Sequence, residues 1–160
     1  MQAIQPILLG LGMLFADGGA APRTPDLSHL QEMLHDRQHP HSQSQAALLL
    51  VQCSLEGAEK TVREGLRSLE NVEEFLALAA AVRLHQDRRF LDELFAALSA
   101  RQPPIREAAA QTLAVLADAH LVTRLQHLAA EREAEPAVRQ IALWTCLLYT
   151  SDAADDLTRV

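Results

Sequence analysis

Hydrophobic residues recur at helical spacing along most of this 160-residue chain. In residues 104–118 the apolar positions Ile105, Ala109, Leu113 and Leu116 follow the i, i+4, i+8, i+11 pattern of one buried helix face. The charged and polar positions between them are Arg106, Glu107, Gln111 and Thr112, and Pro104 and Asp118 mark the two ends of the segment. This pattern predicts an amphipathic helix that is bounded by turns.

Similar stripes predict helices elsewhere in the chain. The expected helices cover residues 26–36, 42–55, 58–69, 72–84 and 88–101, with another after Asp118 that ends at 133–136. Their expected buried positions are Leu27, Leu30, Leu34, Val62, Leu66, Leu69, Phe75, Leu78, Ala79, Val82, Leu91, Leu94, Phe95, Leu98, Val122, Leu125 and Leu128. The expected N-caps are Thr24 before Pro25, Ser42 paired with Gln45, Asn71 paired with Glu74, and Asp87.

The chain also repeats itself. Ile105-Arg106 recurs as Val138-Arg139, and Ala109 recurs as Ala142 at the same offset. Stepping back by that offset from Ile105 reaches Val72, which opens another helical run. A period of roughly 30–40 residues is typical of stacked helical-repeat arrays.

The segments P-I-R-E-A-A-A-Q-T-L-A-V-L-A-D (104–118) and A-V-R-Q-I-A-L-W (137–144) resemble HEAT repeats of the short bacterial type, which also occur in phycobilisome-lyase-like proteins. The resemblance implies an all-α solenoid of stacked antiparallel helical hairpins with a right-handed superhelix. About three repeats would occupy residues 42–145, the last of them truncated. The repeat positions that carry the resemblance are Ile105, Arg106, Ala109, Leu113, Asp118, Val138, Arg139 and Ala142.

Three residues depart from the family pattern. Gln102 stands where an acidic residue is usual, Glu73 replaces the Arg of an earlier copy, and Ala117 replaces the turn Gly. These departures weaken the expectation of the Asp–Arg ladder that often joins adjacent repeats in this family.

Composition narrows the choice of function. Ala and Leu dominate the apolar residues, which favours helix over sheet. The net charge of −7 argues against a nucleic-acid partner held by a basic surface. Two cysteines cannot form a disulfide framework, and Cys53 lies in an apolar run where a core role is expected.

Candidate chemistry is sparse. His35, His39 and His41 could suggest a metal site, but their spacing fits no standard zinc pattern, so we expect a solvated loop. His85, His120 and His127 are expected at the surface. The sequence shows no nucleophile–base pair or phosphate-binding loop, so we expect no catalysis, no cofactor and no bound metal.

The N-terminal residues 1–21 resemble a secretory signal peptide. An apolar run, Ile7–Ala16, precedes the small residues Gly18-Gly19-Ala20, although no Lys or Arg precedes the run. The run is too short to span a bilayer. We therefore expect an exported or periplasmic protein; the alternatives are a first helix or a frayed leader in a cytoplasmic protein. Residues 22–41 would form a linker and the first helix.

The C-terminal residues 146–160 break the repeat. Residues 146–155, C-L-L-Y-T-S-D-A-A-D, are the translation of TGT CTC TTA TAC ACA TCT GAC GCT GCC GAC, a transposase-type sequencing adapter. The segment is therefore interpreted as adapter read-through, and helical periodicity is expected to stop near Thr145. The repeats would then belong to the N-terminal part of a longer protein, and a further repeat should cover Ile141, Leu143 and Trp144.

The function expected from these features is a non-catalytic scaffold for protein–protein interaction. By analogy with other repeat arrays, the polar faces of the second helices are the candidate partner-binding surface. The candidate residues are Glu59, Arg63, Arg67, Arg88, Arg124 and His127. Two alternatives stay open: a repeat module of a larger exported enzyme, and a lyase-like accessory protein that holds a tetrapyrrole.

Overall fold

The computed structural model describes residues 26–53, 55–132 and 136–157, with the backbone alone for 137, 148 and 150–157. This part of the chain is all-helical and contains no strand. Its helices are α1 (Leu27–His35), α2 (Pro40–Gln52), α3 (Ala58–Arg67), α4 (Val72–His85), α5 (Leu91–Ala97), α6 (Pro103–Leu116), α7 (Ala119–Ala130) and α8 (Pro136–Leu157), with a short 3₁₀ helix, η1 (Arg88–Phe90), before α5. The expected signal peptide and the cap at Thr24 lie outside the described residues.

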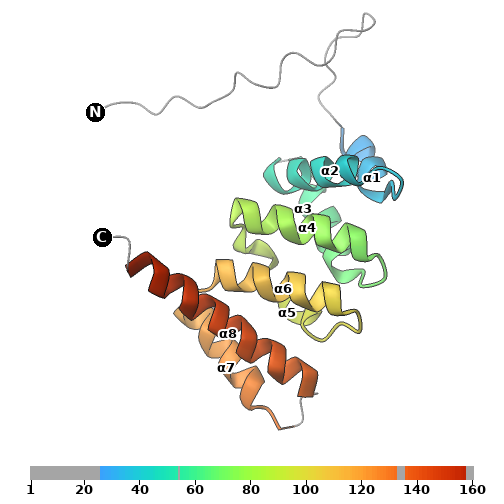
Figure 1. Ribbon diagram of the computed structural model, residues 1–160. Coiled ribbons are helices and arrows are strands. Elements are labelled where there is room, and N and C mark those ends of the chain that lie inside the picture. The colour runs from blue at the N-terminus through green and yellow to red at the C-terminus, as the bar shows by residue number, and fades with distance from the viewer. Residues whose placement is uncertain (1–25, 54, 133–135, 158–160) are drawn as a thin grey trace, which may run out of the picture.

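The helices form two layers. In one layer α2 packs against α4, α4 against α6, and α6 against α8, and these four helices lie side by side in that order (Figure 1). In the other layer lie α1, α3, α5 and α7, each packed against α2, α4, α6 and α8 respectively. The contacts therefore join helices that are near neighbours along the chain.

The core between the two layers is made of leucine, phenylalanine and alanine. Phe75, Phe90 and Ile105 are completely buried. Where α4 meets α6, alanines such as Ala79 and Ala110 are buried, and the hydroxyl of Thr112 donates to the Ala79 carbonyl at 3.3 Å. Small side chains at such contacts let two helix backbones approach closely.

Gly65 shows how tightly α3 packs against α4. A Cβ at this position would lie 2.4 Å from Leu78 Cδ1 and 3.0 Å from Glu74 Oε1. Alanine would normally be favoured in the middle of a helix. Glycine here therefore serves close helix packing, and not a special backbone angle.

Several predicted helix ends agree with the structure. The Asn71 side chain caps α4 by accepting from the Glu74 backbone N–H, and its amide donates to Glu74 Oε2 at 2.9 Å. Asp118 caps α7 by accepting from the Leu121 N–H at 2.8 Å. The buried stripe Ile105, Ala109, Leu113, Leu116 is confirmed.

Other predicted ends were wrong. Ser42 does not cap α2, because this helix begins earlier, at Pro40, a residue that suits the first helical position. Asp26 caps α1 and is not part of that helix. Asp87 does cap this segment as predicted, by accepting from the Arg89 N–H, but the helix expected over 88–101 is divided into η1 and α5 and ends at Ala97.

Two corrections concern the C-terminal half. In α7 the buried positions are Leu121 and Leu125, whereas Val122 and Leu128 are only half-buried. Helix α8 continues past Thr145 to Leu157, so helical structure does not stop where the repeat pattern stops. A helix can form from a segment of any origin, so the interpretation of residues 146–160 as adapter read-through stays a prediction.

The repeated arginine has a visible role in one copy. Arg106, near the start of α6, donates through Nη1 to the carbonyls of Ala100 and Arg101 at 2.8 and 2.9 Å. These carbonyls belong to the turn between α5 and α6. Arg106 therefore ties the start of α6 to the turn that precedes it.

Candidate interaction surfaces

The outer face of α3, α5 and α7 carries a ladder of ion pairs that join successive helices. Arg63 on α3 donates to both oxygens of Glu93 on α5, at 2.9 and 3.0 Å, and Arg67 donates to the same carboxylate at 2.9 Å. The Glu93 side chain is only 2% exposed. Hydrogen bonds with charged partners stabilise such a buried carboxylate, so this pairing holds α3 against α5.

The same ladder extends on both sides of Glu93. Arg89 of η1 pairs with Glu59 on α3 at 3.2 Å, and the Arg89 and Arg63 guanidinium groups lie 5.4 Å from the centre of the buried Phe90 ring. The carboxyl of Glu59 has a lowered pKa, first because Arg63 donates to it. In the pairs that Glu59 and Glu93 make with other helices, the two partners are about one repeat apart in the sequence. The ladder therefore runs in the direction in which successive helices pack.

At the next step the ladder reaches α7. Arg124 pairs with Asp92 on α5 at 3.3 Å and lies 4.4 Å from the Phe95 ring centre. Arg88 pairs with Asp118, the N-cap of α7. The Asp118 pKa is lowered, first by the hydrogen bond from the Leu121 backbone N–H and then by Arg88.

The residues predicted to bind a partner therefore fall into two groups. The ladder contains five of them: Glu59, Arg63, Arg67, Arg88 and Arg124. His127 lies exposed near the end of α7. The structure gives the five a role between neighbouring helices, and their role in partner binding stays a prediction. Apart from Asp118, the ladder uses residues outside the family pattern, which is why comparison with that pattern did not anticipate it.

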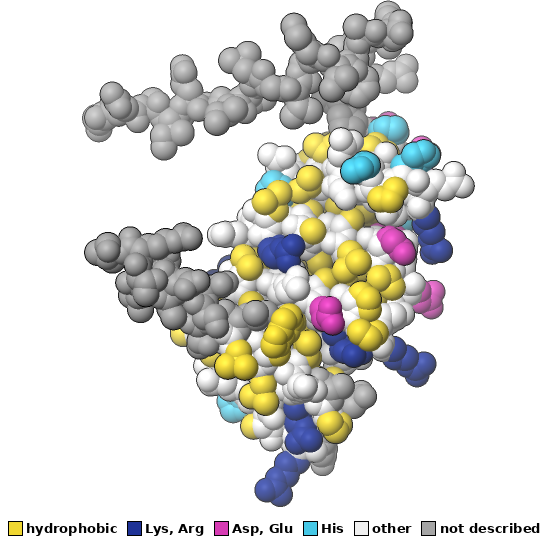
Figure 2. All heavy atoms as spheres, viewed as in Figure 1, with side chains coloured by type: hydrophobic (Ala, Val, Ile, Leu, Met, Phe, Trp, Pro, Cys, Tyr) yellow, Lys and Arg dark blue, Asp and Glu magenta, His cyan; other side chains and the backbone are white. Residues whose placement is uncertain are grey.

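The opposite face, formed by α2, α4, α6 and the described part of α8, shows many apolar side chains with some charged side chains between them (Figure 2). Exposed apolar side chains occur on each of these four helices: Leu49 on α2, Leu76 and Leu84 on α4, Val115 on α6, and Leu143 and Leu147 on α8. Leu84 is the most exposed of them, at 70%. Helix α2 contains no Lys, Arg, Asp or Glu, whereas half of the α3 residues are charged. Leu76 and Leu84 were not among the buried positions expected from the sequence, but a shared surface was not identified either, because that depends on how the helices pack side by side.

Leu143 lies at a repeat position whose counterpart in an earlier helix is buried. By the repeat offset that matches Ala109 with Ala142, Leu143 corresponds to Ala110 of α6. Ala110 is completely buried, whereas Leu143 is 55% exposed. The expectation that Leu143 lies at an uncovered edge is confirmed within the described residues, while Ile141 and Trp144 are half-buried.

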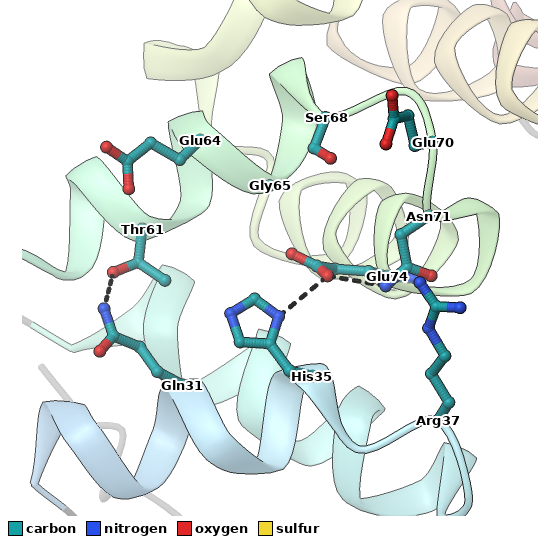
Figure 3. Close-up of a pocket in the computed structure, with 10 residues that line it drawn as sticks. All are labelled: Gln31, His35, Arg37, Thr61, Glu64, Gly65, Ser68, Glu70, Asn71 and Glu74. Atoms are coloured by element: carbon teal, nitrogen blue, oxygen red, sulfur yellow. Dashed lines mark hydrogen bonds and ion pairs between the residues drawn. The ribbon is translucent and has the colours of Figure 1, made fainter.

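A polar hollow of about 470 Å³ lies where α1, α3 and the start of α4 meet (Figure 3). It is lined by Gln31, His35, Arg37, Thr61, Glu64, Gly65, Ser68, Glu70, Asn71 and Glu74. On one side the Gln31 amide donates to the Thr61 hydroxyl at 2.8 Å. On the other side His35 Nδ1 lies 3.1 Å from Glu74 Oε2, which links α1 to α4.

The remaining titratable groups are dispersed. His35 and His39 pair with different carboxylates, those of Glu74 and Asp36, and no group of His, Cys, Asp and Glu among the described residues could hold a metal ion. Cys53 follows the last residue of α2 and is half-buried, so it lies at the border of the core. Burial raises the pKa of the Cys146 thiol. No helix in the described ranges has the length and hydropathy needed to cross a membrane.

Comparisons with known proteins gave no match: no family model fits the chain, and neither the curated proteins nor the solved structures contain a significant relative.

Proposed function

We propose that this chain is a HEAT-like repeat scaffold that binds a partner protein through the apolar face of α2, α4, α6 and α8. The hairpin order and the packing between neighbouring helices support the assignment to stacked repeats. In such an array each hairpin covers the apolar side of the next, and the long faces remain open to partners. We propose no catalytic role for the scaffold itself.

The observation that carries this proposal is the contrast between the two faces. On the face of α3, α5 and α7 the charged side chains largely satisfy each other across neighbouring helices. On the opposite face, Leu76 and Leu84 of α4 remain exposed, at 37% and 70%. Groups of exposed apolar residues are typical of protein interaction sites.

The shape of this face suggests the chemistry of the partner. Leu76, Ala80 and Leu84 are exposed at successive i, i+4 positions of α4, and they form a stripe along the helix. A partner helix with apolar side chains at the same spacing would bury this stripe. The partner would therefore present an amphipathic segment with few charges on its contacting side.

A peptide library displayed on phage tests the proposal. We expect the immobilised protein to select peptides with apolar residues at helical spacing. The double variant Leu76→Gln, Leu84→Gln should bind the selected peptides at least tenfold more weakly, about the effect of losing a central contact. A control variant on the other layer, Lys60→Gln with Glu64→Gln, should bind them normally. Equal binding by the leucine variant and the wild type would exclude this face as the site.

A further inference from the structure

We propose that the segment bound by this apolar face is a helix that runs antiparallel to α4, with basic residues in its last turn beside Glu73 and Glu107. The inference rests on the function proposed above, and it adds the direction of the partner helix and the position of its charges.

The apolar face differs between its two sides. Helices α2, α4 and α6 run in the same direction, so one side of the face holds the starts of these helices and the other holds their ends (Figure 1). Near the starts, Glu73 of α4 and Glu107 of α6 are exposed. Near the ends, Leu84 and Val115 are exposed, at 70% and 44%. The face is therefore acidic on one side and apolar on the other.

Helical spacing places both glutamates on the open face. Glu73 precedes the exposed α4 residue Leu84 by eleven positions, which is close to three full turns. Glu107 precedes Val115 by eight positions on α6, again close to a whole number of turns. Because α4 packs against α6, the two carboxylates belong to one continuous surface. Figure 2 shows acidic side chains among the apolar ones on this face.

The two carboxylates are open to a partner. Neither Glu73 nor Glu107 makes a side-chain hydrogen bond or ion pair with another residue that the structure describes. On the layer of α3, α5 and α7, by contrast, Glu59 and Glu93 each pair with arginines of neighbouring helices. A partner with basic residues at this place would therefore gain charge complementarity without breaking an existing pair.

An arginine marks the opposite side of the face. Arg83, near the end of α4, donates through Nη1 to the amide oxygen of Gln111 at 3.0 Å. This acceptor is neutral, so the positive charge is not balanced by a carboxylate among the described residues. The side with Leu84 therefore favours an acidic group of the partner, and the side with Glu73 favours a basic one.

The helix dipoles favour one direction for such a partner. A helix is stabilised by acidic residues in its first turn and by basic residues in its last turn, and two neighbouring helices attract each other when their dipoles are antiparallel. A partner helix antiparallel to α4 would bring its last turn to Glu73 and its first turn to Arg83. Charge complementarity and the dipoles therefore select the same direction.

Two designed peptides test the inference on the full chain. Both are blocked at their ends, are as long as α4 and carry leucines at i, i+4 and i+8. One has lysines in its last turn, and the other has glutamines at those positions. By fluorescence polarisation, the lysine peptide should bind about three- to tenfold more tightly, as expected for two exposed ion pairs. This gain should shrink at high salt, because salt screens exposed charges.

Two double variants assign the gain to residues. Glu73→Gln with Glu107→Gln should remove the gain and leave the affinity for the glutamine peptide unchanged. The matched control is Glu32→Gln with Glu131→Gln, which changes the net charge equally through exposed carboxylates on α1 and after α7. This control should keep the gain. A gain that survives in the Glu73 and Glu107 variant would overturn the proposal.

A nitroxide at the last residue of the lysine peptide reports the direction. In nuclear magnetic resonance spectra it should broaden the backbone amide signals at the start of α4, such as that of Glu74, more than those at the end, such as that of His85. Stronger broadening at the end of α4 would contradict the antiparallel arrangement.

The outcomes separate this inference from the function on which it rests. If neither peptide binds, or if the Leu76→Gln, Leu84→Gln protein binds both as tightly as the wild type, the apolar face is not the site and both proposals fail. If both peptides bind through the leucines but with equal affinity, or if the control variant loses the gain as well, only the inference about charge and direction fails.

Discussion

The close approach of α3 and α4 at Gly65 allows a quantitative prediction. Replacing Gly65 with alanine would place a methyl group 2.4 Å from Leu78 Cδ1, where an ordinary contact is at least 3.4 Å. Leu78 is completely buried, so it cannot rotate into solvent. The substitution must therefore move Leu78, α4 or both.

Two opposing effects determine the size of the change. Alanine stabilises the middle of a helix by about 1 kcal/mol relative to glycine. Forcing an extra methyl group into a packed core costs about 1–3 kcal/mol, and the short distance at Leu78 places this case in the upper part of that range. We therefore expect Gly65→Ala to lower the free energy of unfolding by about 1–2 kcal/mol.

A double-mutant cycle separates this effect from general damage. Leu78→Ala alone should cost about 2–5 kcal/mol, because it leaves a cavity. In the double variant the methyl group added at position 65 enters the space left by Leu78, so the clash disappears and the combined loss should be smaller than the sum by about 2–3 kcal/mol, the cost of that clash. Urea unfolding followed by circular dichroism measures the wild type, the two single variants and the double variant. Strict additivity, or a Gly65→Ala protein more stable than the wild type, would refute the reasoning.

Three further predictions concern the polar contacts. Glu93→Gln should lower the free energy of unfolding by about 1.5–3 kcal/mol, because it removes charged hydrogen bonds to Arg63. The change is measured by urea unfolding, with Glu64→Gln as the control. Glu64 is exposed, so its substitution should have little effect. Because the Asp118 pKa is lowered on folding, its contribution is complete above the ordinary value of 3.8 and is lost as the pH falls through the lower folded value. The Asp118→Asn protein should therefore show a smaller loss of stability than the wild type when unfolding is measured across that acidic range, and identical profiles would contradict this assignment. Arg106→Ala should cost about 1–2 kcal/mol through the two lost carbonyl bonds, measurable by urea unfolding; a Lys replacement that restores full stability would show that the paired geometry is unimportant.

The sequence predicts the number and type of helices better than their ends. The stripe from Ile105 to Leu116 repeats often enough to fix one buried face, and the structure buries each of its positions. The start of α2 was misplaced because Pro40 and Ser42 are both acceptable near a helix start. The division of residues 88–101 was missed because the apolar spacing alone does not distinguish a 3₁₀ turn from the first turn of an α-helix.

The candidate surfaces could be predicted only in part. The sequence shows that α3 is highly charged, but whether Arg63 pairs with a neighbouring helix or remains open to a partner depends on how α3 and α5 stack. The hollow joins Gln31, Thr61 and Glu74 from three helices, and no local pattern connects them. Similarly, the exposure of Leu84 depends on which side of α4 the next helix covers.

The ladder of ion pairs also bears on how the protein would respond to force. The ion pairs between the described helices mostly join elements about one hairpin apart, such as Glu59 with Arg89 and Asp92 with Arg124. Tension applied along the row of helices would therefore act on these contacts in series, so that each junction between hairpins bears the load. Small displacements at each junction would add up to a large extension, and the weakest junction would yield before the others. A chain built in this way could lengthen or bend around a bound partner while each hairpin stays folded.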